Sequence, residues 1–326
     1  MENKTMVREI MVSITCVAYN HEKYIADAIE SFLMQKTNFS FEILIHDDAS
    51  TDKTAEIIRE YALKYPHLIK PVYQTENMYS KGINVSRFNL DRVTGKYVAV
   101  CEGDDFWTDP YKLQKQVDYM EKHPECSLCV HAAYKVLPDK KKLKSHVRPC
   151  HGDKLFSVEE VIEGGGGLFA TNSFFYPAVY VHNRPQFFKI SLAVDYPLAI
   201  YLSLKGTVYY IDRYMSAYRV DAKGSWRSSM RASTDMQIKH FEKRVELLNE
   251  ANIYTQYKYD DVIKKTIDSM EFYFMIHRGM FEEVKERKYK DLYSGLGIRM
   301  KTKIFIRKYC PKIANILINI KRKFIR

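Results

Sequence analysis

The first hundred residues alternate between short apolar runs and amphipathic segments, and this alternation constrains the fold more than any other feature of the chain. Four apolar runs predict buried strands: residues 10–18, 41–45, 72–74 and 97–101. Three segments with helical spacing or helix-ending signals predict helices: residues 24–34, 53–65 and 83–93. Strands that alternate with helices form a parallel sheet covered on both faces, so the sequence predicts an α/β fold.

Polar clusters follow three of these strands, over residues 15–21, 46–52 and 102–105. Because ligands bind outside the carboxyl ends of parallel strands, we expect all three clusters to meet along one edge of the sheet. The third cluster, Glu102-Gly103-Asp104-Asp105, is called the acidic motif below. Carboxylates this close raise one another's pKa unless a positive charge lies among them. A divalent cation that also binds substrate phosphates removes that cost, so the motif indicates an enzyme that handles a diphosphate through a metal.

Positive charge is concentrated at one end of the chain. The 326 residues carry a net charge of +11, yet residues 299–326 hold ten Lys or Arg and no Asp or Glu. The rest of the chain has 41 basic and 40 acidic residues and is close to neutral. A single basic terminal segment is not the extended basic face typical of nucleic-acid-binding proteins, so we expect no nucleic-acid partner.

Cysteine usage and hydropathy indicate the compartment. Six cysteines are few for this length, and residues 1–9 are polar. No apolar stretch of about 18 residues, the minimum for a membrane-spanning helix, occurs in the sequence. We therefore expect no secretory signal, no membrane-spanning helix and a reducing, cytoplasmic location.

Beyond residue 105 the pattern is less regular. Further helices are expected over 111–122 and 192–204, and most of 231–292. Further strands are expected over 127–136, 174–181 and 208–211, whereas 138–154 should form an exposed loop and Gly164 to Gly167 a mobile one. These patterns predict three parts: a catalytic domain over 1–228, with a nucleotide-binding half to about residue 105 and an acceptor half over 106–228, a helical extension over 229–298, and a basic amphipathic tail over 299–326.

Three motifs, in this order and at these spacings, resemble those of family 2 glycosyltransferases. They are Thr15-Cys16-Val17-Ala18-Tyr19-Asn20, Ile43-Leu44-Ile45-His46-Asp47-Asp48-Ala49-Ser50-Thr51-Asp52, and Glu102-Gly103-Asp104-Asp105-Phe106-Trp107. The resemblance covers roughly residues 10–225. It implies a Rossmann-like fold of the glycosyltransferase A type. It also implies an inverting transfer of a sugar from a nucleotide-diphosphate donor, with UDP as the expected nucleotide.

The resemblance also implies roles for individual residues. The positions that hold the nucleoside are matched by Thr15, Ala18, Tyr19 and Asn20. Either Asp47 or Asp48 would accept a hydrogen bond from the base. The first three residues of the acidic motif match the family's Asp-x-Asp element, with Glu102 in first place and Gly103 between the two carboxylates. Glu102 would contact either the ribose or the metal. Asp104 is the main expected ligand of Mn²⁺ or Mg²⁺, with Asp105 close behind it.

Two later segments match the remaining parts of such an enzyme. Asp195 is the expected catalytic base, although as the first residue of a helix before Pro197 it could also simply cap that helix. The basic segment after Tyr218 offers possible partners for the diphosphate, since arginine donates to phosphate through two nitrogens, or it is a solvated basic loop. The residues in question are Arg219, Lys223 and Arg227, with Trp226 as a possible acceptor wall.

The basic tail has apolar residues on one expected helical face, namely Ile313, Ile316, Leu317, Ile320 and Phe324. A basic amphipathic helix binds the interface of an anionic membrane, which would suit a lipid-linked or other glycan acceptor in surface-polysaccharide synthesis. The alternative is a helix packed on the domain. Two other functions stay open: a sugar nucleotidyltransferase, which would need a Gly-rich basic loop where Ala18-Tyr19-Asn20-His21 stands, and a non-catalytic nucleotide- or sugar-binding module.

Overall fold

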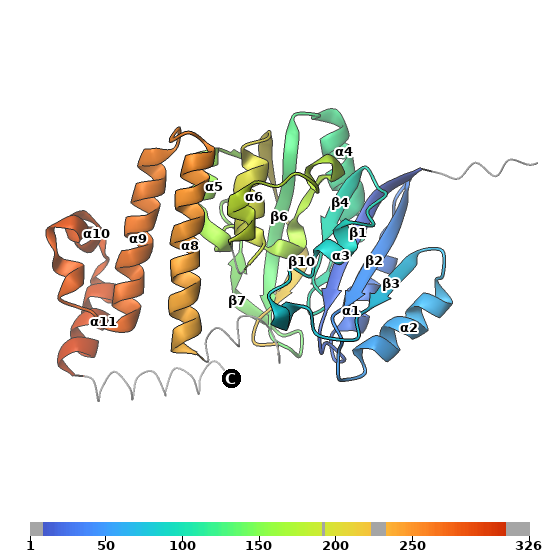
Figure 1. Ribbon diagram of the computed structural model, residues 1–326, viewed down its shortest axis with the longest axis horizontal. Coiled ribbons are helices and arrows are strands. Elements are labelled where there is room, and N and C mark those ends of the chain that lie inside the picture. Colours follow the sequence, from blue (N-terminus) through green and yellow to red (C-terminus); the bar gives the residue numbers. More distant parts are fainter. Residues whose placement is uncertain (1–8, 191–192, 223–232, 311–326) are drawn as a thin grey trace, which may run out of the picture. The chain divides into compact units, whose positions relative to one another are not determined.

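The structure is a computed structural model that describes residues 9–190, 193–222 and 233–310. The chain forms two compact units, Met1–Ile238 and Lys239–Arg326, and the boundary falls inside helix α8, Thr234–Tyr254. The first unit contains a sheet with helices around it, and the second is built of helices (Figure 1).

The N-terminal half of the sheet is parallel, in the order β3-β2-β1-β4. Its strands are β1 (Ile10–Ala18), β2 (Ser40–Asp47), β3 (Ile69–Tyr73) and β4 (Tyr97–Val100). Val12, Ile14 and Cys16 of β1 are fully buried, as expected of a strand with neighbours on both sides and cover on both faces. The predicted strand–helix alternation is confirmed here.

The helices that follow these strands are α1 (Ile25–Leu33), α2 (Thr54–Lys64) and α3 (Arg87–Leu90). On α1 the buried residues Ile25, Ile29 and Phe32 recur at helical spacing and pack into the core. The helix expected over 83–93 is shorter than predicted, because only Arg87–Leu90 is α-helical. The residues before it form a turn, in which the Ser86 amide donates to the Asn84 side chain at 3.1 Å, and Asn89 within the helix donates to the carbonyl of Cys16 at 2.8 Å.

The second half of the sheet is mixed and continues the order as β4-β9-β6-β10-β5. Strand β10 runs parallel to β6, whereas β9 pairs antiparallel with both β4 and β6. The strands are β5 (Phe106–Trp107), β6 (Cys126–Val136), β7 (Lys142–Val147), β8 (Lys154–Phe156), β9 (Phe175–Pro177) and β10 (Thr207–Arg219). The helices are α4 (Lys112–Lys122), α5 (Val158–Gly164) and α6 (Asp195–Ser203). The predicted α/β class with a helix-flanked sheet is confirmed.

The segment expected to be an exposed loop, residues 138–154, is partly strand. Within it, β7 pairs antiparallel with β6 at the sheet edge. Its side chains are mostly exposed and polar, so the sequence shows no apolar alternation there. Aromatic and cationic stacking stabilises the hairpin: the Lys142 ammonium lies 3.7 Å from the Tyr134 ring centroid, and Tyr134 stacks on Tyr214 at 4.3 Å. Strand β10 is also much longer than the predicted 208–211.

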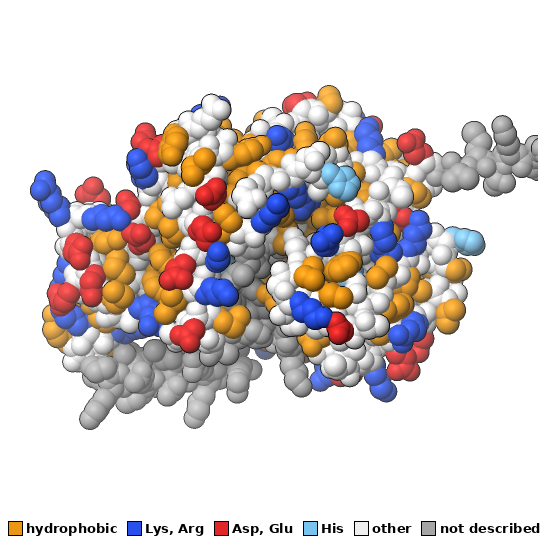
Figure 2. All heavy atoms as spheres, in the orientation of Figure 1, with side chains coloured by type: hydrophobic (Ala, Val, Ile, Leu, Met, Phe, Trp, Pro, Cys, Tyr) orange, Lys and Arg blue, Asp and Glu red, His pale blue; other side chains and the backbone are white. Residues whose placement is uncertain are grey.

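The helical unit has its own small core. Phe272 and Ile276 of α9 (Asp260–Arg278) pack with Val284 and with Ile304 of α11 (Ile298–Tyr309), and α10 (Lys290–Gly295) lies between them in sequence. On the face drawn in Figure 2, basic and acidic side chains of the described residues are interspersed over both units. Within the described part of the chain, no helix is long and apolar enough to cross a membrane. Residues 311–326 of the expected tail lie outside the described residues.

Candidate active site

The three polar clusters meet at the carboxyl edge of the parallel strands, as predicted. Ala18 at the end of β1 pairs in register with Asp47 at the end of β2. On the other side of β1, the amide of Cys101 donates to the carbonyl of Thr15 at 3.1 Å, and the amide of Gly103 donates to that of Val17 at 2.9 Å. The acidic motif therefore lies directly beside the end of β1.

The loops after β1 and β2 are joined by hydrogen bonds. The Asn20 amide donates to the hydroxyl of Ser50 at 2.9 Å, and the Asn20 side chain accepts from the Thr51 amide at 2.8 Å. Both loops turn through left-handed residues, with φ of 55° at Asn20 and 59° at Ala49. Asn20 and Ala49 thus shape the rim of the site, and the ring of Tyr19 is 36% exposed there.

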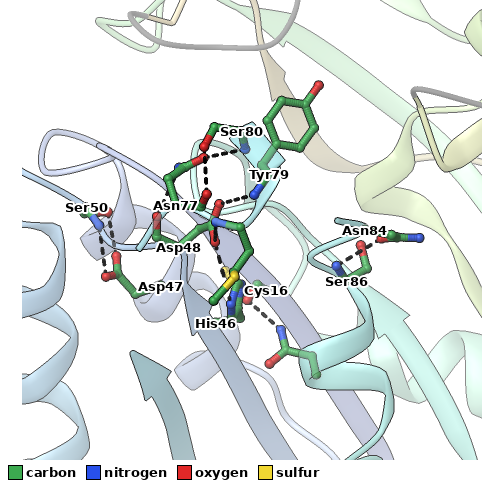
Figure 3. Close-up of polar contacts among 12 residues, drawn as sticks. Cys16, His46, Asp47, Asp48, Ser50, Asn77, Tyr79, Ser80, Asn84 and Ser86 are labelled. Atoms are coloured by element: carbon green, nitrogen blue, oxygen red, sulfur yellow. Dashed lines mark hydrogen bonds and ion pairs between the residues drawn. The ribbon is translucent and has the colours of Figure 1, made fainter. Parts of the chain in front are cut away.

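Asp47 and Asp48, both buried, hold two different segments. Asp47 accepts from the Ser50 hydroxyl at 2.5 Å and from the Ser50 amide at 3.2 Å. Asp48 accepts from the amides of Met78 and Tyr79 at 2.9 and 3.0 Å, and thereby anchors the segment that crosses the strand end (Figure 3). Because a carboxylate offers about four lone pairs, each of these aspartates keeps acceptor capacity for a ligand.

His46 supports this region from within the core. Its ring stacks on Phe88 with centroids 4.8 Å apart, and its Nε2 lies 4.0 Å from Oδ1 of Asp48. Burial lowers the pKa of His46, which keeps the imidazole neutral. Thr15 and Ala18 are also buried, and the Thr15 hydroxyl donates to the carbonyl of Ala99 at 3.4 Å.

Glu102 is electrostatically unusual. Its Oε2 atom is shielded from solvent and has no hydrogen-bond partner among the residues that the structure describes. Burial, followed by the negative charges of Asp104 and Asp195, raises the pKa of Glu102 to about 8. A carboxylate in this position lacks a positive partner, which a bound cation would supply.

Gly103 is packed too closely to carry a side chain. A Cβ there would lie 2.9 Å from Nδ1 of His21, 3.0 Å from Cδ1 of Ile25 and 3.1 Å from Cβ of Ala18. The His21 ring is buried, and burial lowers its pKa. The acidic motif is therefore seated against β1 and α1 through this glycine.

Asp105, the last residue of the acidic motif, and Arg219 are both buried. Asp105 accepts from the amide of Arg219 at 2.7 Å and from the side-chain amide of Asn172 at 2.9 Å. Burial, and then the charge of Asp104, raise the pKa of Asp105. The Arg219 guanidinium pairs with Asp27 at 2.8 Å and also donates to the carbonyl of Asp104. Asn172 and Asp27 were not singled out from the sequence, because each lies far along the chain from its partner.

Asp195 begins α6, and its Oδ1 accepts from the amide of Tyr196 at 2.8 Å. The negative charge of Asp195 contributes to the raised pKa of Glu102, so Asp195 lies within electrostatic reach of the acidic motif. The glycine run borders it, since a Cβ at Gly166 would lie 3.6 and 3.7 Å from the two Asp195 oxygens. Lys223, Trp226 and Arg227 lie outside the described residues.

The metal-ligand set is small. Among the described residues, no group of three or more His, Cys, Asp or Glu side chains is arranged to hold a metal ion. Glu102 and Asp104 offer two carboxylates, and the unpartnered Oε2 of Glu102 fits a divalent cation whose remaining ligands come from a substrate. This arrangement is typical of enzymes that bind Mg²⁺ or Mn²⁺ together with phosphates.

A sheet whose carboxyl edge gathers carboxylates from separate loops is typical of an α/β enzyme that binds its ligand at that edge. The family model described as glycosyl transferase family 2 matches residues 13–183, more than half of the chain. The chain belongs to this family.

Individual relatives and structures agree with this assignment. An uncharacterized protein of Mycobacterium tuberculosis is 35% identical over 222 residues, which cover 67% of this chain and 61% of that protein. The chain thus spans less than two thirds of that relative. The structure of Staphylococcus aureus TarS in complex with UDP-GlcNAc matches with a TM-score of 0.54 and 18% identity, over 74% of this chain and 66% of TarS. A mannosyltransferase from Pyrobaculum calidifontis, in complex with GDP-Man and Mn²⁺, matches with a TM-score of 0.50 and 13% identity, over 94% and 89% of the two chains. The two structural matches show a shared fold.

Proposed function

We propose that this chain is a glycosyltransferase that moves a sugar, with inversion, from a nucleotide-diphosphate donor to a hydroxyl group of a glycan or lipid-linked acceptor, with a divalent metal. The observation that carries the proposal is the meeting of the three polar clusters at one edge of the sheet, where the acidic motif lies beside the end of β1. Asp195, whose charge acts on Glu102, would supply the carboxylate that takes the proton, and the acidic motif would hold the cation of the leaving diphosphate.

The donor's nucleoside would lie over the end of β1, among Tyr19, Asn20, Asp47 and Asp48. The exposed ring of Tyr19 offers a surface for the base, and the free lone pairs of Asp47 and Asp48 can accept from a base N–H. UDP is the proposed nucleotide. The fold shared with TarS, which binds UDP-GlcNAc, supports a nucleotide-sugar donor of this kind.

Asp104, with Glu102 beside it, would hold the cation. Mn²⁺ or Mg²⁺ there would act as a Lewis acid that stabilises the charge of the departing diphosphate. Asp105 is left out of this set, because it is buried, held by Arg219 and Asn172, and already beside the positive charge of Arg219. The Mn²⁺-bound mannosyltransferase with the same fold supports the choice of metal.

Asp195 would act as the general base. It removes the proton of the acceptor hydroxyl while that oxygen attacks the anomeric carbon and the bond from this carbon to the diphosphate breaks. Attack and departure on opposite faces of the sugar invert the anomeric centre. The hydrogen bond from the Tyr196 amide fixes one Asp195 oxygen at the start of α6. The N-cap position of α6 is Val194, so Asp195 lies one residue inside the helix, where this local hydrogen bond is compatible with catalysis.

The proposed cellular location depends on the exposed residues of the helical unit. On α11, three apolar side chains are strongly exposed: Ile298 at 80%, Phe305 at 58% and Tyr309 at 57%. The same helix carries several lysines and arginines, so it would bind the interface of an anionic membrane. We therefore propose a cytoplasmic enzyme, bound peripherally to the membrane, that would serve surface-polysaccharide synthesis.

The catalytic part is tested with Asp195→Asn and the matched control Asp118→Asn, an exposed α4 carboxylate bonded only to Gln114 in the described structure. A panel of nucleotide sugars with Mn²⁺ is screened first by thermal shift and then by nucleotide release. We expect Asp195→Asn to keep donor binding and to lose roughly 10²–10⁴-fold in turnover, as for a general base. Turnover equal to that of Asp118→Asn would remove Asp195 from the mechanism.

The membrane part is tested by flotation with vesicles containing phosphatidylglycerol. Phe305→Ser should weaken binding of the full chain, whereas the control Leu63→Ser, which changes an 82% exposed leucine on α2, should not. Equal flotation of Phe305→Ser and wild-type protein would refute the role of α11.

A further inference from the structure

The guanidinium of Arg219 is enclosed by the protein. Its side chain is 0% exposed, and Nη2 donates to Oδ2 of Asp27 at 2.8 Å. Nη1 donates to the main-chain carbonyl of Asp104. The rings of Tyr24 and Phe106 lie over it, with centroids 4.6 and 5.1 Å from the guanidinium carbon. Both terminal nitrogens of Arg219 thus donate within the protein, and its Nε is buried without a hydrogen-bond partner among the described residues.

A second set of hydrogen bonds holds the same strand end. The Arg219 amide donates to Oδ1 of Asp105 at 2.7 Å, and Asn172 donates to Oδ2 of Asp105 at 2.9 Å. Asn172 is itself fixed, because its Nδ2 also donates to the carbonyl of Ala217 at 3.1 Å and its Oδ1 accepts from the Ser216 hydroxyl at 2.7 Å. Asn172 and Ser216 are fully buried. Two of these bonds end on Asp105, and the other two hold Asn172, which donates one of the bonds to Asp105.

The four residues at the centre of these bonds are called the positioning cluster: Asp27, Asp105, Asn172 and Arg219. The cluster fixes Asp104 from two sides, through its own carbonyl and through the side chain of the next residue. Catalytic groups must be held to within about 0.5 Å, and residues behind a metal ligand commonly supply that precision. Asp27 also accepts from Lys140 at 2.6 Å, which joins the β6–β7 turn to the cluster.

We propose that the positioning cluster holds Glu102 and Asp104 in the geometry that binds the divalent cation, and that Arg219 acts through them and not on the diphosphate. This inference rests on the proposed function and deepens it. It gives Arg219 a role different from the phosphate contact that the sequence suggests.

The variants are chosen to break the cluster without removing charge. In Arg219→Lys one ammonium cannot replace the arginine fork that spans Asp27 and the Asp104 carbonyl. Asn172→Ala removes a neutral partner of Asp105. The matched control is Arg148→Lys, because Arg148 also binds a carboxylate through two nitrogens, that of Asp212 at 2.7 and 2.6 Å, and is no part of the cluster.

The measurement is the affinity of the full chain for UDP by isothermal titration, once with EDTA and once with MnCl₂, together with thermal unfolding of each variant. We expect metal-free UDP affinity to be unchanged in Arg219→Lys and Asn172→Ala. The gain in affinity that Mn²⁺ confers should fall by roughly 10–100-fold in both, the range typical when partners behind metal ligands are removed. Arg148→Lys should keep the wild-type gain.

Three results would overturn the inference. Weaker metal-free UDP binding in Arg219→Lys would indicate direct contact with the phosphates. A wild-type Mn²⁺ gain in both variants, even with a lower melting temperature, would leave the cluster a purely structural role. Absence of any Mn²⁺ gain in the wild-type protein, seen before any variant is compared, would refute the metal in the proposed function and the inference with it.

Discussion

Replacing Gly103 by alanine is a direct test of how the acidic motif is seated. The new Cβ would meet three atoms at 2.9–3.1 Å, whereas ordinary van der Waals contacts begin at 3.4 Å. Each neighbour would have to give by a few tenths of an ångström. Ala18 lies on a central strand, and Ile25 begins a helix packed on it, so neither moves freely. Overpacking of this kind costs roughly 1–3 kcal/mol of unfolding free energy.

The added methyl group would also affect catalysis, because the acidic motif would shift more readily than the strand and the helix that it contacts. A displacement approaching 1 Å at Glu102 and Asp104 would lower kcat/KM by up to roughly 100-fold. Urea unfolding gives the stability, and nucleotide release with Mn²⁺ gives the activity. Gly167→Ala is the control, since nothing lies within 4 Å of a Cβ there and its φ is not in the left-handed region.

A double variant locates the strain. Ile25→Val removes the Cδ1 atom that lies 3.0 Å from the new Cβ. Gly103→Ala and Ile25→Val together should therefore destabilise the protein by less than the sum of the single changes, by at least about 0.5 kcal/mol. Unfolding free energies of Gly103→Ala and Gly167→Ala that agree within about 0.5 kcal/mol would refute the close seating of the motif, since that is the usual range for changes without such contacts.

Three further predictions concern single polar groups. Because burial raises the pKa of Glu102 from 4.5 to about 8, the folded protein keeps a proton that the unfolded chain releases, so metal-free stability should fall as the pH rises from about 5 to 8. Glu102→Gln should lack this loss. If the urea midpoints of the variant and of the wild-type protein change with pH in the same way over that range, the prediction is wrong. Asp48→Asn leaves one acceptor oxygen for two amides, so we expect a loss of roughly 1–3 kcal/mol and a higher donor KM, measured by unfolding and steady-state kinetics. Ser157→Ala removes the α5 capping box with Glu160 and should cost about 0.5–2 kcal/mol by urea unfolding, with an unchanged KM.

The sequence predicted those parts of the fold that local patterns determine. Continuous apolar runs identified β1, β2 and β4, and the parallel arrangement then required their polar ends to converge. Strand β7 was missed because an exposed edge strand carries no apolar alternation. Helix α3 was overestimated because the residues before it form a turn, which the apolar spacing over 83–93 does not reveal.

The candidate site was predictable as a set of clusters but not as a set of contacts. Asp195 was singled out because the family resemblance implies an acidic residue at the start of a helix there, and its catalytic role stays a prediction. The burial of Arg219 was not visible, since its partner Asp27 lies 192 residues away and only the completed sheet brings them together. Asn172 carried no signal at all, because a lone asparagine in an irregular segment has many ordinary explanations.

The acidic motif illustrates why counting carboxylates in a sequence overstates the ligands of a cation. Glu102 has a buried oxygen with no partner in the described structure, and Asp104 is fixed through its carbonyl. Asp105, directly after them, is buried and accepts hydrogen bonds from Arg219 and Asn172. Asp105 is thus held in place by donors within the protein. Two carboxylates remain for a cation, so further oxygen ligands would have to come from the donor's phosphates, and tight metal binding should require the nucleotide.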